Sequence, residues 1–406
     1  MQIKFIHIVL LALLMGNAVS GYAQEWSPFT LQDKPGIRIG QNINFQTNTL
    51  PANFVKEVWQ SNHLTHQIKT AALNNLQTLD NLAKLENKTT LQFTHPLKDS
   101  SFIFSTRITN QQFGEMSFSK TTFQLAFFGN STSIGQKVPL DFHYRDMALQ
   151  TMQLGLHYKG KKHIAGIEFG PVSGSYMFDF ELNDGYIYTQ EDLSGIEAGG
   201  EAIATWSDST GKRDLWSGTG ISAAIYYGYK SKDHQFYIML DDFGLINFQN
   251  NDISDQTDST WNYSGVNYNI FEQDEVIFNI NQDSVQQWTN LKKAGNKRYM
   301  LPSALRFGLK QQFENRKFFL NILGKYHLYS FARPELKIMP GWTLNQTWEI
   351  MASMSHGGYS SLNAGLHIKS KFENGWHLAI GSNNLAGMWF NNHPAAMDVY
   401  LTIYKY

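Results

Sequence analysis

The chain has 406 residues, of which 33 are Lys or Arg and 34 are Asp or Glu, so its formal net charge is −1. This balance argues against a nucleic-acid partner, which selects for a strongly basic surface. The chain has no cysteine, so its fold cannot depend on disulfides. It is rich in Phe (28), Tyr (19), Trp (10) and Gly (32) and poor in Pro (10), a composition that favours a β-rich protein.

Residues 1–23 have the layout of a secretory signal peptide, and we expect cleavage before Gln24. Lys4 precedes an apolar stretch over residues 5–15, which is shorter than the roughly 20 residues that a membrane-spanning helix needs. The rest of the chain has no other long apolar stretch, so we expect no transmembrane helix. Without cysteine the signal is not of the lipoprotein type. An exported β-rich chain of this kind is either a barrel in a bacterial outer membrane or a soluble sandwich or propeller.

The first predicted strand covers residues 36–46. From residue 53 to residue 88 the pattern changes, because apolar residues such as Leu64, Ile68 and Ala72 recur at helical spacing. This spacing predicts two or three short helices. We expect the segment 47–99 that holds them either to cover a sheet edge or barrel mouth, or to plug a lumen.

The remainder of the chain alternates apolar and polar residues, as half-buried strands do. In the clearest strand, Leu362, Leu366 and Ile368 share one face, whereas Asn363 and His367 share the other. Each segment is about ten residues long, the length that a tilted strand needs to cross a bilayer. The fourteen predicted strands are 36–46, 100–109, 115–128, 147–159, 163–181, 217–230, 236–248, 302–312, 316–328, 333–342, 346–355, 359–370, 374–384 and 396–406.

The connections between these strands fall into two groups by length. The short turns are 160–162, 231–234, 313–316 and 372–375. The long connections are 129–146, 182–216, 249–301 and 385–395. If the C-terminus is periplasmic, counting strands backwards places every one of these short turns on the periplasmic side and every long connection outside, which is typical of outer-membrane barrels. We therefore predict an all-β fold: a transmembrane antiparallel β-barrel of about 14 strands over residues 24–406, with a short N-terminal helical plug or cap at 47–99.

Several short segments, taken in order, resemble a known family. They are 78–88 (TLDNLAKLENK), 101–107 (SFIFSTR), 118–120 (FSK), 125–130 (LAFFGN), 239–248 (MLDDFGLINF), 297–302 (KRYMLP) and 382–387 (SNNLAG). Together they are similar to the uncharacterised domain-of-unknown-function family 5723 of Bacteroidota, and more distantly to PorV-type proteins of type IX secretion and to FadL-type fatty-acid channels. The resemblance covers most of the mature chain and implies a barrel in the outer membrane. It transfers no catalytic residues, and the loop 255–261 (DQTDSTW) has no counterpart in the family.

No pattern in the sequence predicts an enzyme, a cofactor or a metal site. The histidines are scattered, without HExxH or a tight group of ligands. His63 and His66 could share a helix face, but a solvated helix surface is the simpler interpretation. Ser355 and His356 are neighbours on a strand and therefore point to opposite faces, and no GxSxG motif occurs.

Polar residues that alternate with apolar ones on the predicted strands should point into the lumen. Basic residues outnumber acidic ones among them, which indicates either an anion-favouring interior or Lys and Arg side chains at the membrane interface near strand ends. The predicted lumen-lining residues are Arg107, His157, Lys159, Lys230, Arg306, Lys310, Lys325, His327, His367 and Lys369.

These observations lead to three functional hypotheses, of which a surface enzyme is the one that no motif supports. The first is a channel or transporter for a small or hydrophobic solute, by likeness to the fatty-acid channels. The alternative is a scaffold or binding protein that transports nothing, such as a partner of type IX secretion, acting through its long outer loops. The expected partners are outer-membrane lipid, the barrel-assembly machinery, for which Tyr406 belongs to the recognition signal, and other envelope proteins.

Overall fold

The structure is a computed structural model. It describes residues 34–405 except 61–62, 99–100, 208–215, 249–250, 257–260, 264–290, 294–296, 314–316, 374, 386 and 388–392. The predicted signal peptide and Tyr406 lie outside the described residues.

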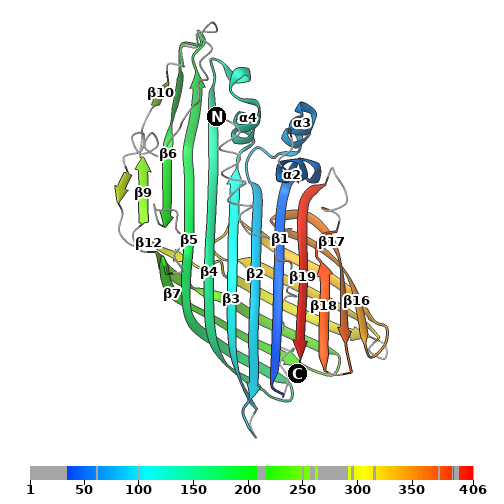
Figure 1. The fold of residues 1–406 in the computed structure, drawn as a ribbon. Helices are drawn as coiled ribbons and strands as arrows, with labels where there is room; N and C mark the ends of the chain where they lie inside the picture. Colours follow the sequence, from blue (N-terminus) through cyan, green and yellow to red (C-terminus); the bar gives the residue numbers. More distant parts are fainter. Residues whose placement is uncertain are drawn as a thin grey trace.

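Fourteen antiparallel strands form a closed barrel, in which each strand pairs with the next and the last pairs with the first (Figure 1). Closure occurs between the first and last strands, where Ile37 is opposite Lys405 and Gln46 is opposite Ala396. In order around the barrel the strands are β1 (Gly36–Pro51), β2 (Asn81–Pro96), β3 (Phe102–Phe118), β4 (Lys137–Lys159), β5 (His163–Thr189), β7 (Gly218–Lys230), β8 (His234–Phe248), β13 (Ala304–Phe313), β14 (Phe318–His327), β15 (Arg333–Thr343), β16 (Trp348–Gly358), β17 (Ser360–Lys371), β18 (Trp376–Ser382) and β19 (Pro394–Lys405).

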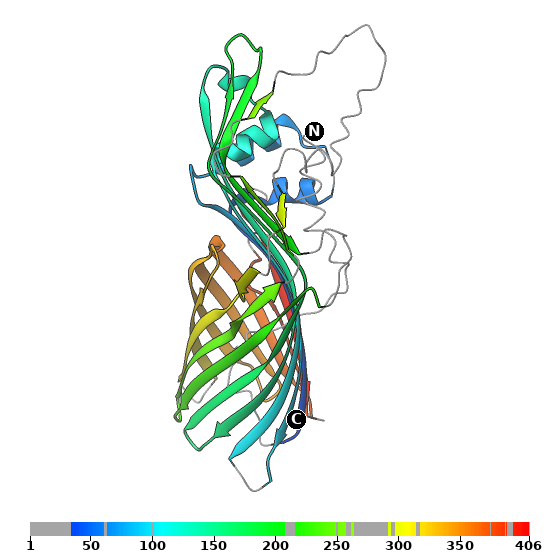
Figure 2. The ribbon, with the colours of Figure 1, turned by 90° about the vertical axis from the view of Figure 1, so that its left-hand side faces the viewer.

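The sheet continues beyond the barrel on one side (Figure 2). β4 and β5 have 23 and 27 residues, more than twice the length that crosses a bilayer. The far part of β5 pairs with β6 (Ile196–Ser207), and β6 pairs with β9 (Asn251–Gln256) and β10 (Trp261–Tyr263). Two further short strands, β11 (Leu291–Lys293) and β12 (Lys297–Met300), pair with β9 and with the end of β8.

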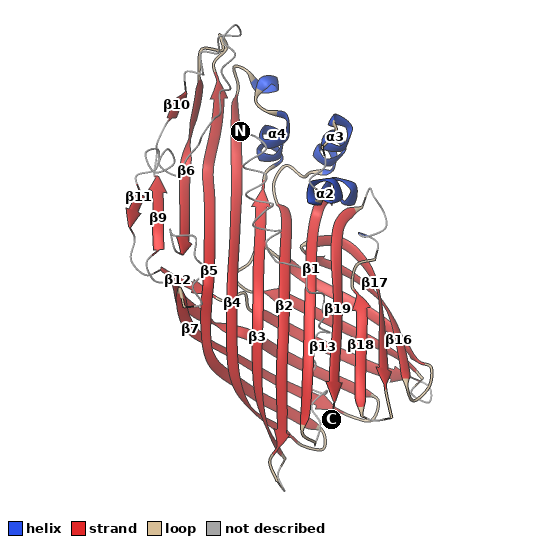
Figure 3. Ribbon diagram, viewed as in Figure 1, coloured by secondary structure: helices blue, strands red, loops and turns tan. Residues whose placement is uncertain are grey.

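Three short α-helices lie beyond the barrel rim, at the end where this extension rises (Figure 3). They are α2 (Ala52–Trp59), α3 (His66–Asn75) and α4 (Lys120–Phe128), and the 3₁₀ turn η2 (Ser131–Ser133) follows α4. Phe54 of α2, Ala72 of α3 and Phe123 of α4 are buried in one apolar cluster with strand residues such as Phe118. Among the described residues no helix is long and apolar enough to cross a membrane.

The structure differs from the prediction in the long connections, parts of which are strand (137–146 in β4, 182–189 in β5, and β6), and in two further places. Residues 81–96 form the strand β2, where helical spacing had predicted helix to residue 88; β2 pairs along its length with β1 and β3, and this pairing outweighs the local spacing of leucines. The segments 100–109 and 115–128 are not two strands. They are β3 followed by α4, because the Ser119 side chain caps a helix by accepting a hydrogen bond from the Thr122 N–H. The predicted number of strands is right because these two errors cancel.

The barrel has an apolar exterior and a polar interior. On β4, Met152, Leu154 and Leu156 point outwards and are 47–50% exposed, whereas Gln153 and His157 point inwards and are fully buried. Soluble barrels show the opposite arrangement. The apolar face of the alternating strands therefore meets lipid, and the fold is a transmembrane barrel.

The sorting of connections by length is confirmed. The four predicted short turns lie at the end of the barrel where β1 begins and β19 ends, and so do the connections 97–101 and 344–347. The barrel strands joined by the four predicted long connections, and those joined by the segment 52–80, meet at the opposite end, which we call the long-loop end. Two connections at this end are nevertheless short, 328–332 and the single residue Tyr359.

The outward position of Leu154 leads to a stability prediction. Leu154→Arg places a charge on the lipid-facing wall, and we expect it to lower the free energy of unfolding in vesicles by about 2–4 kcal/mol. Denaturant titration followed by tryptophan fluorescence measures the change. Leu193→Arg is the control, because Leu193 is 66% exposed between β5 and β6, beyond the barrel. Equal effects of the two substitutions would contradict a lipid-facing wall.

Candidate transport lumen

The lumen contains a cavity of about 320 Å³. Among the described residues that line it, eight are basic and five are acidic. Seven of the ten predicted lumen residues contribute to its lining: Arg107, Arg306, Lys310, Lys325, His327, His367 and Lys369.

The other three predicted residues lie elsewhere. His157 points inwards but is completely buried between neighbouring strands. Lys159 and Lys230 are the last residues of β4 and β7, at the short-turn end of the barrel.

Arg107 is the centre of a buried network of charges. Its Nε lies 2.7 Å from Glu168 Oε2 of β5, and its Nη1 lies 3.1 Å from Asp241 Oδ1 of β8. Its Nη2 lies 3.4 Å from Asp242 Oδ1, and its Nε also donates to Gln153 Oε1 at 2.9 Å. A guanidinium with donors pointing in several directions suits this role, because it can bind several acceptors at once.

A β-bulge brings both aspartates to the lumen. The register of β7 and β8 shifts between Ala223 and Ile225, and Asp242 has a φ of 51°. In a regular strand adjacent side chains point to opposite faces, but the extra residue of a bulge lets Asp241 and Asp242 both point inwards. The sequence analysis missed these two residues. An Asp-Asp pair inside an otherwise alternating strand was the available signal.

The network reaches other parts of the barrel wall. Lys88 of β2 forms an ion pair with Asp242, and Arg306 Nη2 of β13 lies 3.5 Å from Asp241 Oδ2. Glu168 Oε1 also accepts hydrogen bonds from Gln92 and from Ser105, both at 3.3 Å. The charges of five strands thus neutralise one another inside the lumen, where an unpaired charge would be costly.

A second polar cluster joins opposite walls of the barrel near the long-loop end. Glu115 of β3 accepts hydrogen bonds from the Ser330 hydroxyl at 2.7 Å, from the Phe331 N–H at 3.2 Å and from the Tyr359 hydroxyl. Arg145 of β4 donates to the Tyr329 carbonyl at 3.1 Å. Around the barrel β15 is seven strands from β3 in either direction, so the turn 328–332 that precedes it comes from the opposite wall. We call these contacts the Glu115 latch.

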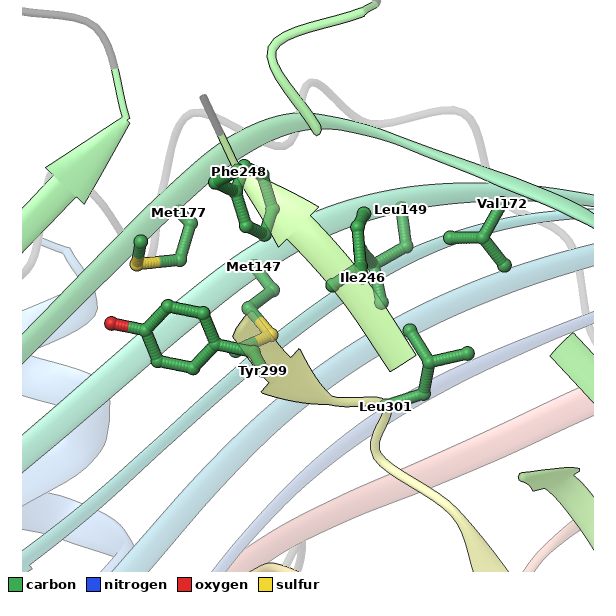
Figure 4. Close-up of a cluster of buried hydrophobic side chains, with 8 residues drawn as sticks. All are labelled: Met147, Leu149, Val172, Met177, Ile246, Phe248, Tyr299 and Leu301. Atoms are coloured by element: carbon green, nitrogen blue, oxygen red, sulfur yellow. The ribbon is translucent and has the colours of Figure 1, made fainter. Parts of the chain in front are cut away.

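Apolar side chains form a third inner feature near this end (Figure 4). Met147 and Leu149 of β4, Val172 and Met177 of β5, Ile246 and Phe248 of β8, Tyr299 and Leu301 pack together and are all buried. This cluster therefore packs one side of the long-loop end without lining the cavity, whereas the Arg107 network lies closer to the short-turn end.

Two histidines have the same set of partners in different parts of the barrel. His157 Nδ1 lies 2.7 Å from the Tyr226 hydroxyl, and its Nε2 lies 2.7 Å from Ser105 Oγ. His367 Nδ1 lies 2.6 Å from the Tyr400 hydroxyl, and its Nε2 lies 2.8 Å from Ser353 Oγ. The ring planes are nearly parallel in both pairs, at 21° and 22°.

A glycine makes each of these contacts possible. Gly166 is opposite His157 on one side and Tyr226 on the other, and Gly381 has the same position between His367 and Tyr400. A Cβ on Gly166 would come within 2.4 Å of His157 Nδ1, and one on Gly381 within 2.5 Å of His367 Nδ1. The tyrosine ring therefore lies across the space that the missing side chain leaves.

Within the described ranges, no group of three or more His, Asp and Glu side chains is placed to hold a metal ion.

The sequence profile described as "Family of unknown function (DUF5723)" matches residues 35–382. The chain belongs to this family. No curated protein is significantly similar to it in sequence.

Several solved structures are similar to this member of the family. The Pseudomonas putida toluene transporter TodX matches 96% of this chain and 94% of its own, with 10% identity and a TM-score of 0.46. The Ralstonia pickettii toluene transporter TbuX matches 95% and 94%, with 9% identity and a TM-score of 0.41. A Pseudomonas aeruginosa FadL homologue matches 92% and 90%, with 10% identity and a TM-score of 0.46.

The Arg107 network leads to a second stability prediction. Arg107→Met leaves three buried carboxylates with less compensation, so we expect the free energy of unfolding to fall by about 3–5 kcal/mol. Denaturant titration in vesicles is the measurement. Arg107→Lys is the matched variant, since it keeps the charge but loses the branched donor geometry, and it should cost less. If both variants were as stable as the parent, the network would not be a stabilising one.

The repeated His–Tyr contacts lead to a third prediction. Tyr226→Phe and Tyr400→Phe each remove the partner of a buried imidazole nitrogen, and each should lower the free energy of unfolding by about 1–3 kcal/mol. Tyr227→Phe is the control, because the Tyr227 hydroxyl also lies 2.8 Å from a histidine nitrogen, that of His163, but on the exposed face. We expect a change within about 0.5 kcal/mol there. A control effect as large as the others would contradict a special role for the buried contacts.

Proposed function

We propose that this protein is an outer-membrane channel that passes a small solute and is closed at its long-loop end by the Glu115 latch. The observation that carries the proposal is the closed barrel with a polar cavity of about 320 Å³ inside an apolar wall. A cavity of this size is typical of sites for small molecules. Apolar side chains that line the cavity, such as Leu323, Met339 and Met351, favour a solute with some hydrophobic character.

The latch has the features of a gate. It joins opposite walls through one short turn rather than through the wall itself, so opening it breaks no strand pairing. The acceptor is a single carboxylate, Glu115, which is 1% exposed and binds Ser330, Phe331 and Tyr359. A turn held by a few charge-assisted hydrogen bonds can move without unfolding the barrel.

The proposal includes the route by which the protein reaches its membrane. Residues 1–23 would direct export, and the barrel-assembly machinery would insert the mature chain, whose apolar exterior supports a position in lipid. The sequence resemblance supports a source among the Bacteroidota and a distant likeness to PorV-type proteins. Contacts with other envelope proteins would use the long connections, and transport needs no catalytic residue.

Removing the latch should open the channel. In proteoliposomes we expect Glu115→Ala to raise the influx of small neutral solutes roughly tenfold, because the closed state loses about 1.5–3 kcal/mol of charge-assisted hydrogen bonding. Liposome swelling in a series of sugars of increasing size measures this flux. Tyr359→Phe removes one of the hydrogen bonds and should give a smaller increase.

Glu373→Ala is the control, since Glu373 is exposed in the short turn between β17 and β18, away from the latch. Electrophoresis without boiling should show that every variant is a folded barrel. If folded parent and Glu115→Ala proteins both admitted no solute, the proposed channel function would be wrong.

A further inference from the structure

We propose that the lumen holds a binding site for a small organic anion, whose charged group binds Lys310 and Lys369 and whose apolar part rests on Leu323, Met339 and Met351. This inference deepens the proposed channel function and rests on it. It names the class of solute and the side of the cavity that selects it.

The two lysines differ from the other basic residues around them. Lys88 is paired with Asp242, Arg306 with Asp241, and Lys337 Nζ lies 3.7 Å from Glu335 Oε1. Lys310 and Lys369 also line the cavity. In the described part of the chain, however, neither of them has a carboxylate within ion-pair distance.

The surroundings of each lysine leave its charge available. Lys310 Nζ lies 3.9 Å from the centre of the Phe319 ring, a contact that holds the side chain without neutralising it. Glu349, which is opposite Lys369 in the pairing of β17 with β16, attracts both lysines electrostatically, but no described carboxylate lies within ion-pair distance of either ammonium group. Ammonium groups in a confined lumen lose part of their hydration, and an anion is the ligand that compensates for this loss.

An apolar surface adjoins Lys310. Phe319 of β14, Met339 of β15 and Met351 of β16 are buried together, and Leu323 packs against them. Met339, Met351 and Leu323 line the same cavity as the two lysines. Methionines adapt their shape to different apolar groups, which suits a surface that receives a ligand.

Both lysines lie near the ends of their strands, close to the proposed periplasmic exit of the lumen. Lys310 is three residues from the end of β13, and Lys369 is two residues from the end of β17. Both strands end at the short-turn end of the barrel. A solute that passes the latch would therefore meet the self-neutralised Arg107 network first and last the two lysines that have no described carboxylate within ion-pair distance, which favours anions as the molecules released.

The test uses the full-length mature protein in detergent and the probe hexane-1-sulfonate, which combines a permanent negative charge with a short alkyl chain. We expect isothermal titration calorimetry to show saturable binding. The double variant Lys310→Met, Lys369→Met keeps side-chain length but removes both charges, and it should weaken binding at least tenfold. Lys232→Met is the matched control, because Lys232 is exposed in the turn between β7 and β8 and should leave the affinity unchanged.

Two further probes separate the parts of the site. Hexan-1-ol has the alkyl chain without the charge, and sodium sulfate has the charge without the chain; both should bind at least tenfold more weakly than the sulfonate. Equal binding of hexan-1-ol, or unchanged affinity of the folded double variant, would overturn the role of the lysines. Equal binding of sulfate would overturn the role of the apolar surface.

Flux measurements distinguish this inference from the channel function. If sugars enter proteoliposomes but hexane-1-sulfonate neither binds nor slows their entry, the channel function stands and the anion site is wrong. If the sulfonate binds but no solute enters even through Glu115→Ala, the site stands and the channel function is wrong.

Discussion

The need to satisfy every backbone hydrogen bond within lipid determines the rest of this structure. A strand edge exposed to hydrocarbon would leave N–H and C=O groups without partners, so a membrane-spanning sheet must close. Here β1 and β19, which are more than 300 residues apart in sequence, pair from Ile37 with Lys405 to Gln46 with Ala396. Closure then fixes which side chains meet inside the lumen, because every strand within the barrel has one face in lipid and one inside.

The local sequence predicted the fold correctly wherever alternation of apolar and polar residues assigns each side chain to one face of a strand. The alternation around Leu362 and His367 gives inward and outward positions directly, and the lengths of the connections give the two ends of the barrel. The local pattern gave the wrong prediction at β2. Leu76, Leu79, Leu82 and Leu85 have helical spacing, but Asn81–Pro96 pairs with strands on both sides. Pairing with distant segments is not visible in a local pattern, so no local rule could have chosen strand there.

The side-chain contacts inside the lumen could not be predicted from local sequence, for a related reason. Seven of the predicted lumen residues line the cavity, but their partners depend on the register between strands that are distant in sequence. Arg107 and Asp241 are 134 residues apart, and Glu115 and Tyr359 are 244 apart. A signal for the repeated histidine contacts was present, since Gly-Leu-His-x-Lys occurs at 155–159 and again at 365–369. This repeat could be interpreted only with the glycines Gly166 and Gly381 on the neighbouring strands. Which glycines these are depends on the register between the strands.

The distribution of charge in the lumen argues for a passage rather than a solid core. A barrel that needed only stability could fill its interior with apolar side chains, since buried ion pairs contribute little net stability compared with good apolar packing. This barrel instead keeps a cavity, neutralises the charges around Arg107 within the lumen and, among the described residues, places no carboxylate within ion-pair distance of Lys310 or Lys369 near the short-turn end. At the other end a single buried carboxylate, Glu115, holds the turn 328–332 against the opposite wall. A charge-balanced middle, contacts between opposite walls at one end and two lysines toward the other are the order of parts that the proposed passage of an anion would use.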